Sequence, residues 1–200
     1  MLISQKYNPI YQLPYCCVPA TLQWILYRRG LDILDQQSIG AELGLQLPQK
    51  GQKLFSHPNI VFTDIVPETG YGTQIHKPEY SIQGFFDRHQ IPLNISDLYQ
   101  FTSPATLSDF LLAHFTEDRD IIIRYHTRIF QQAEDAKNEP GNKSSGYGHF
   151  SVMVSYDVEN GKITLGNPDL PFYSEVSLED LIFAMSDQID GIKRGLYIVS

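Results

Sequence analysis

Apolar positions recur with helical spacing in the first half of the chain and form β-type runs in the second half. The spacing of Leu22, Ile25 and Leu26 predicts a first helix that begins near Pro19. Further helical patterns cover residues 36–43, 82–89, 104–115 and 178–185. Apolar runs predict strands at residues 60–62, 93–99, 121–125, 149–156, 163–165 and 195–199. Helices therefore dominate the first part and a mostly antiparallel sheet the last, which is an α+β arrangement.

Local signals mark where several of these elements begin. Ser81, Ser103 and Ser177 each precede a helical pattern, and a serine side chain there can accept hydrogen bonds from the unpaired N–H groups of the first turn. Asn160-Gly161 lies between two β-type runs, and this dipeptide favours a tight hairpin turn. The strands at residues 149–156 and 163–165 are therefore expected to pair.

Two segments lack a repeating apolar pattern. In residues 48–78 the composition turns to Gly, Pro and Lys, with Asn at Asn59, and we expect an irregular segment that faces a substrate. Residues 131–148 are too polar to bury themselves, so we expect a mobile loop there. We interpret residues 129–148 as a solvated linker; if the segment is functional, its position just before His149 makes it a lid or a docking segment for a partner.

Composition and charge narrow the function classes. The chain has 200 residues, of which 42% are hydrophobic, and we expect a single globular domain over residues 1–200. The net charge of −8 and the scattered Lys and Arg residues argue against a nucleic-acid partner. No apolar run approaches membrane-spanning length, and the N-terminus lacks the pattern of a signal peptide. We therefore expect no membrane partner and a cytoplasmic location, with export by a signal-independent route left open.

The two cysteines are adjacent in sequence, at Cys16 and Cys17. A disulfide between sequence neighbours is strained, so no disulfide framework is expected. The His, Asp and Glu residues show no ligand-like spacing, and we expect neither a metal nor another cofactor. The simplest interpretation of the pair is two small buried side chains.

Cys17 nevertheless lies at the start of the first predicted helix. Unpaired N–H groups and the positive end of the helix dipole stabilise an anion there, which favours a nucleophilic thiolate. His149, at the first position of a predicted strand and 132 residues after Cys17, is the best general base. His126, which ends another strand, is the rival base. His57, His76 and His89 are expected to be solvated, and His114 to lie in the core or at its rim.

A base needs a partner that orients it, and the oxyanion needs donors. The predicted hairpin brings Asn167 back beside the start of its first strand, where its side chain can accept a hydrogen bond from His149. Asp169 is the alternative orienting residue. Gln12, five residues before Cys17, can donate to an oxyanion together with the backbone N–H of Cys17.

Three motifs carry a resemblance to a known family. They are Cys-x-Pro-Ala-x-Leu from Cys17, Gly-His-Phe-Ser-Val-Met-Val around His149, and Asn-Pro at Asn167. In these motifs and in the order of its elements the chain resembles papain-like cysteine peptidases of the bacteriocin-processing, double-glycine-leader type. The resemblance implies a papain-like fold in which an N-terminal helical part, with the cysteine helix, packs on a C-terminal antiparallel sheet.

The resemblance also implies residue roles. Cys17 is the nucleophile, His149 the base, Asn167 the orienting residue where that group usually has Asp, and Gln12 the oxyanion donor; Cys16 competes with Cys17, but the Pro-Ala-x-Leu register favours Cys17. Val18 stands where glycine is usual, and Gln12 lies one residue closer to the cysteine than is usual. Peptidases of this group often cut leader peptides while fused to a transporter. We expect neither a fused transporter, so that this substrate is not carried over, nor activation by removal of a pro-segment.

Three functions remain open from the sequence. The first is a thiol hydrolase, a cysteine peptidase or amidase that forms an acyl-thioester at Cys17 and acts on a peptide or protein substrate. The second is an acyltransferase or transglutaminase-like enzyme with the same triad, which passes the acyl group to an amine. The third is an inactive papain-like domain that binds a peptide, an alternative suggested by Val18.

Overall fold

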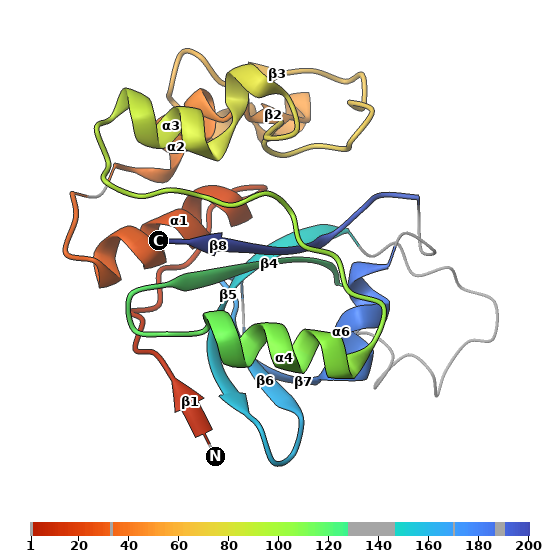
Figure 1. Ribbon diagram of the computed structural model, residues 1–200. Helices are drawn as coiled ribbons and strands as arrows, with labels where there is room; N and C mark the ends of the chain where they lie inside the picture. Colours follow the sequence, from red (N-terminus) through yellow and green to blue (C-terminus); the bar gives the residue numbers. More distant parts are fainter. Residues whose placement is uncertain (1, 33, 128–146, 170, 187–190) are drawn as a thin grey trace. The chain divides into compact units, whose positions relative to one another are not determined.

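The structure is a computed structural model that describes residues 2–32, 34–127, 147–169, 171–186 and 191–200 (Figure 1). The chain forms two compact units. The sheet unit comprises Met1–Lys6, Ser96–Asn167 and Pro171–Val199, and the helical unit comprises Tyr7–Ile95, Pro168–Leu170 and Ser200. The single domain expected for residues 1–200 stays a prediction. Nearly all of the loop expected at residues 129–148 lies outside the described residues.

The sheet unit is built on a six-stranded antiparallel sheet. Five strands follow the order β7-β6-β5-β4-β8, and β1 pairs with β5 beside this path. The strands are β1 (Leu2–Ser4), β4 (Asp120–His126), β5 (Gly148–Asp157), β6 (Lys162–Gly166), β7 (Tyr173–Ser177) and β8 (Gly195–Val199). The turn between β5 and β6 contains Gly161 with φ 60°, a conformation that glycine adopts without strain.

β5 is the central strand and carries His149 near its start. Its first half pairs with β4, so that Tyr125 lies opposite His149. Its second half pairs with β1 and β6, and the register with β6 shifts at a β-bulge. Because Val152 pairs with Gly166, the antiparallel direction carries Asn167 toward the start of β5. The hairpin thus brings two sequence-predicted site residues to the same end of the sheet.

Two helices, α4 (Pro104–His114) and α6 (Leu178–Met185), cover one face of this sheet. Ser103 and Ser177 cap them by accepting the N–H groups of Thr106 and Asp180. The core between helices and sheet consists of buried apolar side chains, including Leu107, Leu111, Phe115, Ile121, Ile123, Met153, Ile163, Leu165, Leu181, Met185 and Leu196. This packing holds β4 and β5, and with them His149, in a rigid frame.

The helical unit contains short elements around one long helix. Its helices are α1 (Cys17–Arg28), α2 (Gln36–Glu42) and α3 (Ile82–Arg88), with the 3₁₀ helices η1 (Gln49–Leu54) and η2 (Pro78–Tyr80). β2 (Gln46–Leu47) and β3 (Val61–Phe62) form a parallel pair. Ser81 caps α3 by accepting the N–H of Gly84. Of the helices that the structure describes, none combines the length and apolar character needed to cross a bilayer.

The α+β class and most predicted elements are confirmed, but the strand expected at residues 93–99 is wrong. Ser96 donates to the carbonyl of Ile198, and Tyr99 forms an isolated bridge with Leu196. The N–H of Ile198 bonds the Ser96 hydroxyl instead of its carbonyl, and the register shifts by one residue before the bridge at Tyr99, so no continuous ladder forms. At Gly195 a Cβ would lie 2.0 Å from the carbonyl oxygen of Tyr99, so the close approach requires glycine. The sequence patterns also did not indicate β1, β2 or β7.

Candidate active site

Cys17 is the first residue of α1. Pro19 lies in the first turn, where its missing N–H leaves no bond unmade, as the sequence predicted. The Cys17 side chain is partly exposed, whereas Val18 and Pro19 are buried. The first turn contains no acidic residue that would oppose a thiolate. Cys17 is therefore accessible at the end of a helix where backbone N–H groups favour an anion.

Cys16 differs sharply from its neighbour. It is fully buried against Leu45, Leu47 and Ile60. Burial, with a smaller contribution from the negative charge of a Cys17 thiolate, raises the pKa of the Cys16 thiol to about 12. A thiol in this state is a small apolar side chain rather than a nucleophile. Of the two cysteines, the geometry favours Cys17 as the reactive one.

The backbone that leads to Cys17 is held by polar side chains from two helices. The indole N–H of Trp24, in α1, donates to the carbonyl of Ile10 over 2.9 Å. Gln36, in α2, accepts the N–H of Leu13 over 2.7 Å and donates to the carbonyl of Tyr11 over 2.8 Å. Both side chains are buried, so these bonds are shielded from water. The approach to the cysteine is thereby fixed on both sides of Gln12.

A strained turn joins the backbone segment before Cys17 to α1. Tyr15 has φ 63°, in the left-handed region that residues other than glycine rarely adopt. The N–H of Cys16 bonds the carbonyl of Leu13 over 2.9 Å and closes the turn. The Tyr15 ring packs edge-on against Tyr71 at a centroid distance of 6.0 Å. Such strain persists only where surrounding contacts hold it, and it is common beside functional residues.

Gln12 lies within the fixed approach segment. Its backbone N–H donates to the carbonyl of Pro168 over 2.9 Å. Its side-chain Oε1 is buried, and no donor among the described residues bonds it. Rotation of the amide by half a turn exchanges the oxygen and the NH₂ group at this position. Gln12 can therefore present an amide donor here.

His149 and Asn167 form a buried polar pair in the sheet unit. The imidazole Nε2 and the amide Oδ1 of Asn167 are 2.7 Å apart. His149 is 1% exposed and Asn167 is 7% exposed. An amide oxygen can only accept a hydrogen bond, so Nε2 carries the proton in this pair. In the neutral imidazole, Nδ1 is then the nitrogen that accepts a proton.

The alternative residues occupy different positions. His126 ends β4 and lies opposite Gly148, one residue before His149. It is buried, like His149, but the amide of Asn167 bonds His149. Asp169 belongs to the helical unit, as do Cys16, Cys17 and Gln12, while His149, Asn167 and His126 belong to the sheet unit. The structure thus brings together His149 and Asn167, the predicted base and its predicted orienting amide, within one unit.

Comparisons with known proteins add a likeness in fold. No protein-family model and no curated protein sequence matches the chain. The peptidase domain of Streptococcus ComA, a bifunctional ABC transporter involved in quorum sensing, is 14% identical and 96% of each chain is covered, with a TM-score of 0.47. Xylellain, a cysteine protease from Xylella fastidiosa, is 12% identical, with 100% of this chain and 85% of that one covered and a TM-score of 0.43. The chain resembles these two proteins, and at such identities the likeness concerns the fold alone.

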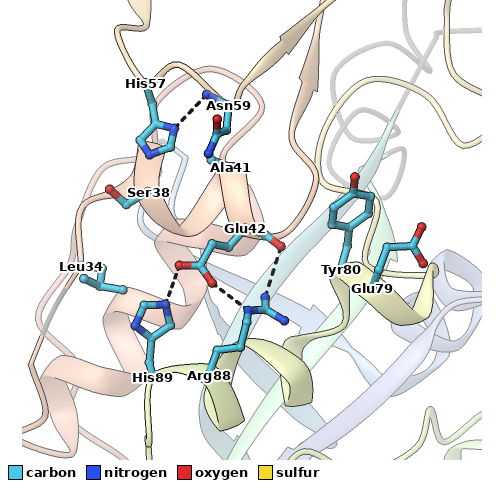
Figure 2. A pocket seen from close by; sticks show the side chains of 10 residues that line it. All are labelled: Leu34, Ser38, Ala41, Glu42, His57, Asn59, Glu79, Tyr80, Arg88 and His89. Carbon is cyan, nitrogen blue, oxygen red and sulfur yellow. Dashed lines mark hydrogen bonds and ion pairs between the residues drawn. The ribbon is translucent and has the colours of Figure 1, made fainter.

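The helical unit also contains an open polar pocket of about 580 Å³. Figure 2 shows Glu42, Arg88 and His89 meeting on one side, with Tyr80 and Glu79 beside them. The other residues that line it are Leu34, Ser38, Ala41, His57 and Asn59. None of the sequence-predicted site residues lines this pocket. In the described part of the chain, no group of three or more His, Cys, Asp or Glu side chains could hold a metal ion.

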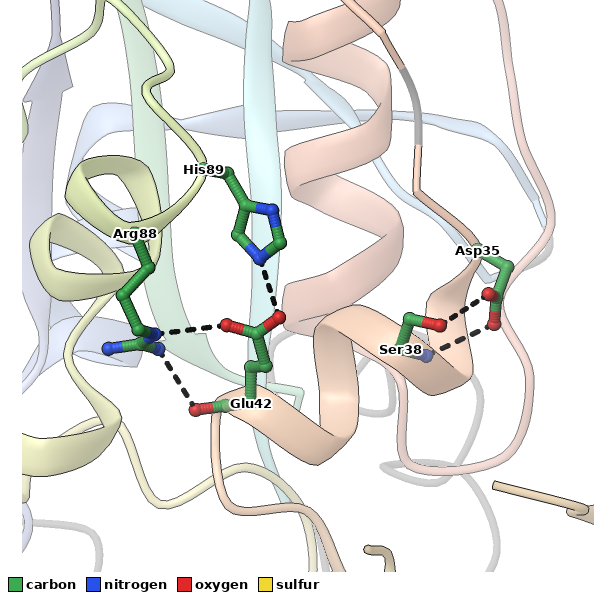
Figure 3. A network of polar contacts seen from close by, with 5 residues as sticks. All are labelled: Asp35, Ser38, Glu42, Arg88 and His89. Carbon is green, nitrogen blue, oxygen red and sulfur yellow. Dashed lines mark hydrogen bonds and ion pairs between the residues drawn. The ribbon is translucent and has the colours of Figure 1, made fainter. Parts of the chain in front are cut away.

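One carboxylate links α2 to the end of α3 beside this pocket. Glu42 accepts from Arg88 Nε over 3.0 Å and pairs with His89 Nε2 over 2.5 Å (Figure 3). Partial burial raises the pKa of Glu42, but the hydrogen bonds and charges of His89 and Arg88 outweigh it and lower that pKa below its ordinary value. His89 is exposed, as the sequence predicted, and it also pairs with Glu42. Glu42 and His89 are 47 residues apart, so no local sequence signal indicates this pair.

The start of α2 gives a stability prediction. Asp35 caps the helix by accepting the N–H groups of Gln37 and Ser38, and it also accepts the Ser38 hydroxyl (Figure 3). Asp35→Ala should lower the free energy of unfolding by about 1 kcal/mol at pH 7. Urea unfolding measures this, with Asp32→Ala as a matched control, because Asp32 is an exposed aspartate outside the cap.

The effect of Asp35→Ala should depend on pH in a fixed direction. The Ser38 hydroxyl, and then the two backbone donors, hold the pKa of Asp35 below its ordinary value. A depressed folded pKa means that the carboxylate stabilises the fold above the unfolded pKa of about 3.9, and that this contribution disappears as pH falls through the folded value. The difference between wild type and variant should therefore shrink in acid. An equal difference at pH 7 and at pH 2.5 would contradict the assignment.

Proposed function

We propose that the protein is a thiol hydrolase, a cysteine peptidase or amidase, in which Cys17 attacks a peptide or amide carbonyl. The observation that carries this proposal is the buried His149–Asn167 pair, with Nε2 and Oδ1 2.7 Å apart. This pair fixes the tautomer in which Nδ1 accepts a proton. A base of this kind is what a cysteine nucleophile at a helix N-terminus requires.

In each half of the proposed reaction His149 acts first as a base and then as an acid. His149 Nδ1 takes the proton of the Cys17 thiol, and the thiolate forms a bond to the carbonyl carbon. The oxyanion accepts hydrogen bonds from the Cys17 backbone N–H and the Gln12 amide. As the C–N bond breaks, the imidazolium gives its proton to the leaving amine and an acyl-thioester remains. His149 then takes a proton from water as the water attacks the thioester carbonyl. The C–S bond breaks, the acid leaves, and the imidazolium returns its proton to the Cys17 sulfur.

Contacts within the helical unit support the proposed roles of Gln12 and Cys17. Pro168 directly follows Asn167 in the chain, and its carbonyl accepts the N–H of Gln12. Cys16 is buried with a pKa of about 12, which leaves Cys17 as the only cysteine of the chain suited to nucleophilic attack. Val18 stands where the peptidases that the chain resembles usually have glycine, and it is 2% exposed.

Covalent labelling of the nucleophile and, in separate samples, peptide cleavage test the proposal. The full-length protein is incubated with internally quenched peptide libraries and with a peptidyl chloromethyl ketone, and intact-protein mass spectrometry locates the adduct. We expect a single adduct on Cys17, peptide cleavage, and a turnover rate independent of added amine. A rate that rises with amine, with transfer of the acyl group to it, would replace hydrolysis by acyl transfer. Reversible peptide binding with neither adduct nor cleavage would overturn the proposal in favour of a binding domain.

A further inference from the structure

Two tyrosine rings pack against the imidazole of His149. The Tyr125 ring lies 5.6 Å from it, centroid to centroid, at an interplanar angle of 81°. The Tyr147 ring lies 5.8 Å away, also at 81°. Edge-on contacts at these distances are favourable between aromatic rings and define their relative orientation. The imidazole is thus bounded by Asn167 at one nitrogen and by two aromatic rings.

Asn167 alone does not fix the direction of Nδ1. The imidazole turns about its Cβ–Cγ bond, and Nε2 lies closer to that axis than Nδ1 does. A hydrogen bond at Nε2 therefore restricts this rotation less than a bond at Nδ1 would. The plane of the ring, and with it the direction of Nδ1, depends on what packs against the ring. Tyr125 and Tyr147 are two aromatic side chains that make such a contact.

Tyr125 is part of the frame of the sheet unit. It is fully buried, lies opposite His149 in the β4–β5 ladder, and belongs to the core under α4 and α6. Its hydroxyl is 3.0 Å from the Ser151 Oγ, within hydrogen-bond distance. Replacing Tyr125 would disturb the core as well as His149, so its role in catalysis is hard to separate from stability.

Tyr147 is fixed in a different way. Its backbone extends the β4–β5 pairing: its carbonyl accepts the N–H of Thr127 over 3.0 Å, and its N–H donates to the Thr127 Oγ1 over 3.1 Å. Its side chain is 53% exposed and lies outside the core cluster. The backbone thus holds a half-exposed ring against His149, and the ring can be changed without opening the core.

We propose that Tyr147 is a positioning residue for the reaction: its ring sets the plane of the His149 imidazole and so aims Nδ1. The role rests on the proposed function, because a directed Nδ1 matters only to a base that serves Cys17. The contact that defines this role lies between the two rings. Tyr147→Phe should therefore preserve it, and Tyr147→Leu should remove it.

Nitrogen NMR of the full-length protein observes the ring directly. Long-range ¹H–¹⁵N spectra follow the Nδ1 and Nε2 shifts of His149 against pH, with His149→Gln identifying its signals among the six histidines. Iodoacetamide alkylation of Cys17 against pH is measured on the same samples. Tyr27→Leu is the matched control, since Tyr27 is a 49% exposed tyrosine near the end of α1.

In Tyr147→Leu we expect altered His149 nitrogen shifts, a displaced titration midpoint, and alkylation of Cys17 about two- to tenfold slower at neutral pH. Tyr147→Phe and Tyr27→Leu should match wild type in all three. Unchanged His149 shifts and midpoint in Tyr147→Leu, or a loss in Tyr147→Phe equal to that in Tyr147→Leu, would overturn the proposal. If wild-type Cys17 reacts as an ordinary thiol, the proposed function fails, while the His149 spectra still report whether Tyr147 positions the ring.

Discussion

Cys17→Ala is expected to abolish rapid alkylation by iodoacetamide near neutral pH and to reduce any peptide turnover on the order of 10³-fold or more. The reason is that the other cysteine cannot replace it. A pKa of about 12 leaves about one Cys16 thiolate in 10⁵ at pH 7, whereas an ordinary thiol with a pKa of about 8.5 is ionised to a few per cent. Loss of Cys17 therefore removes nearly all of the reactive thiolate.

Cys16→Ala is the matched control for this result. Its small side chain packs in a buried cluster with Leu45 and Leu47, so its loss should affect stability slightly and leave alkylation of Cys17 intact. Peptide mapping after alkylation at several pH values identifies the labelled cysteine. Labelling confined to Cys16, or a Cys17 rate that follows an ordinary thiol pKa, would contradict the nucleophile assignment.

His149→Ala is expected to have an effect of similar size. Without a base, alkylation of Cys17 should follow the ionisation of an ordinary thiol, and its midpoint should move toward about pH 8.5. Peptide turnover should fall on the order of 10³-fold because general-base and general-acid steps are both lost. The measurement is the pH dependence of alkylation, followed by kcat/KM on the best peptide. His76→Ala, at an exposed histidine of the helical unit, should change neither.

Replacements of Asn167 test the orientation of the His149 imidazole while the base itself is retained. Asn167→Ala removes the acceptor for His149 Nε2 and leaves a buried N–H unbonded, which should cost about 1–3 kcal/mol in stability. Turnover should fall less than in His149→Ala, about 10- to 100-fold, because the base remains but is not oriented. Asn167→Asp keeps an acceptor at the same place and should recover much of the loss. Equal activity in Asn167→Ala and wild type would remove Asn167 from the site.

Elements with local signals were predictable from the sequence. Ser81, Ser103 and Ser177 cap helices because a short hydroxyl reaches the free N–H groups of the next turn, whatever the rest of the chain does. The turn at Asn160-Gly161 likewise depends on backbone preference alone. The prediction of a strand at residues 93–99 was wrong because a strand forms only where a partner strand pairs with it continuously. Their bonds to β8 occur at separate points, and a β-type pattern does not reveal this.

In the candidate site, too, some features were predictable from the sequence and others were not. Helical periodicity predicted that a helix starts at Cys17. The hairpin signal predicted that the strand of His149 pairs with the strand that leads to Asn167, so the sequence by itself predicted the two residues of the buried pair. The Pro-Ala-x-Leu register favoured Cys17 over Cys16, but only the tertiary structure showed that Cys16 is buried, because the pKa of a thiol depends on which distant side chains exclude water from it. The same holds for the rings that flank His149 and for the Glu42–His89 pair. Local sequence sets where elements begin and turn, whereas burial and contacts between distant residues arise only when the chain folds.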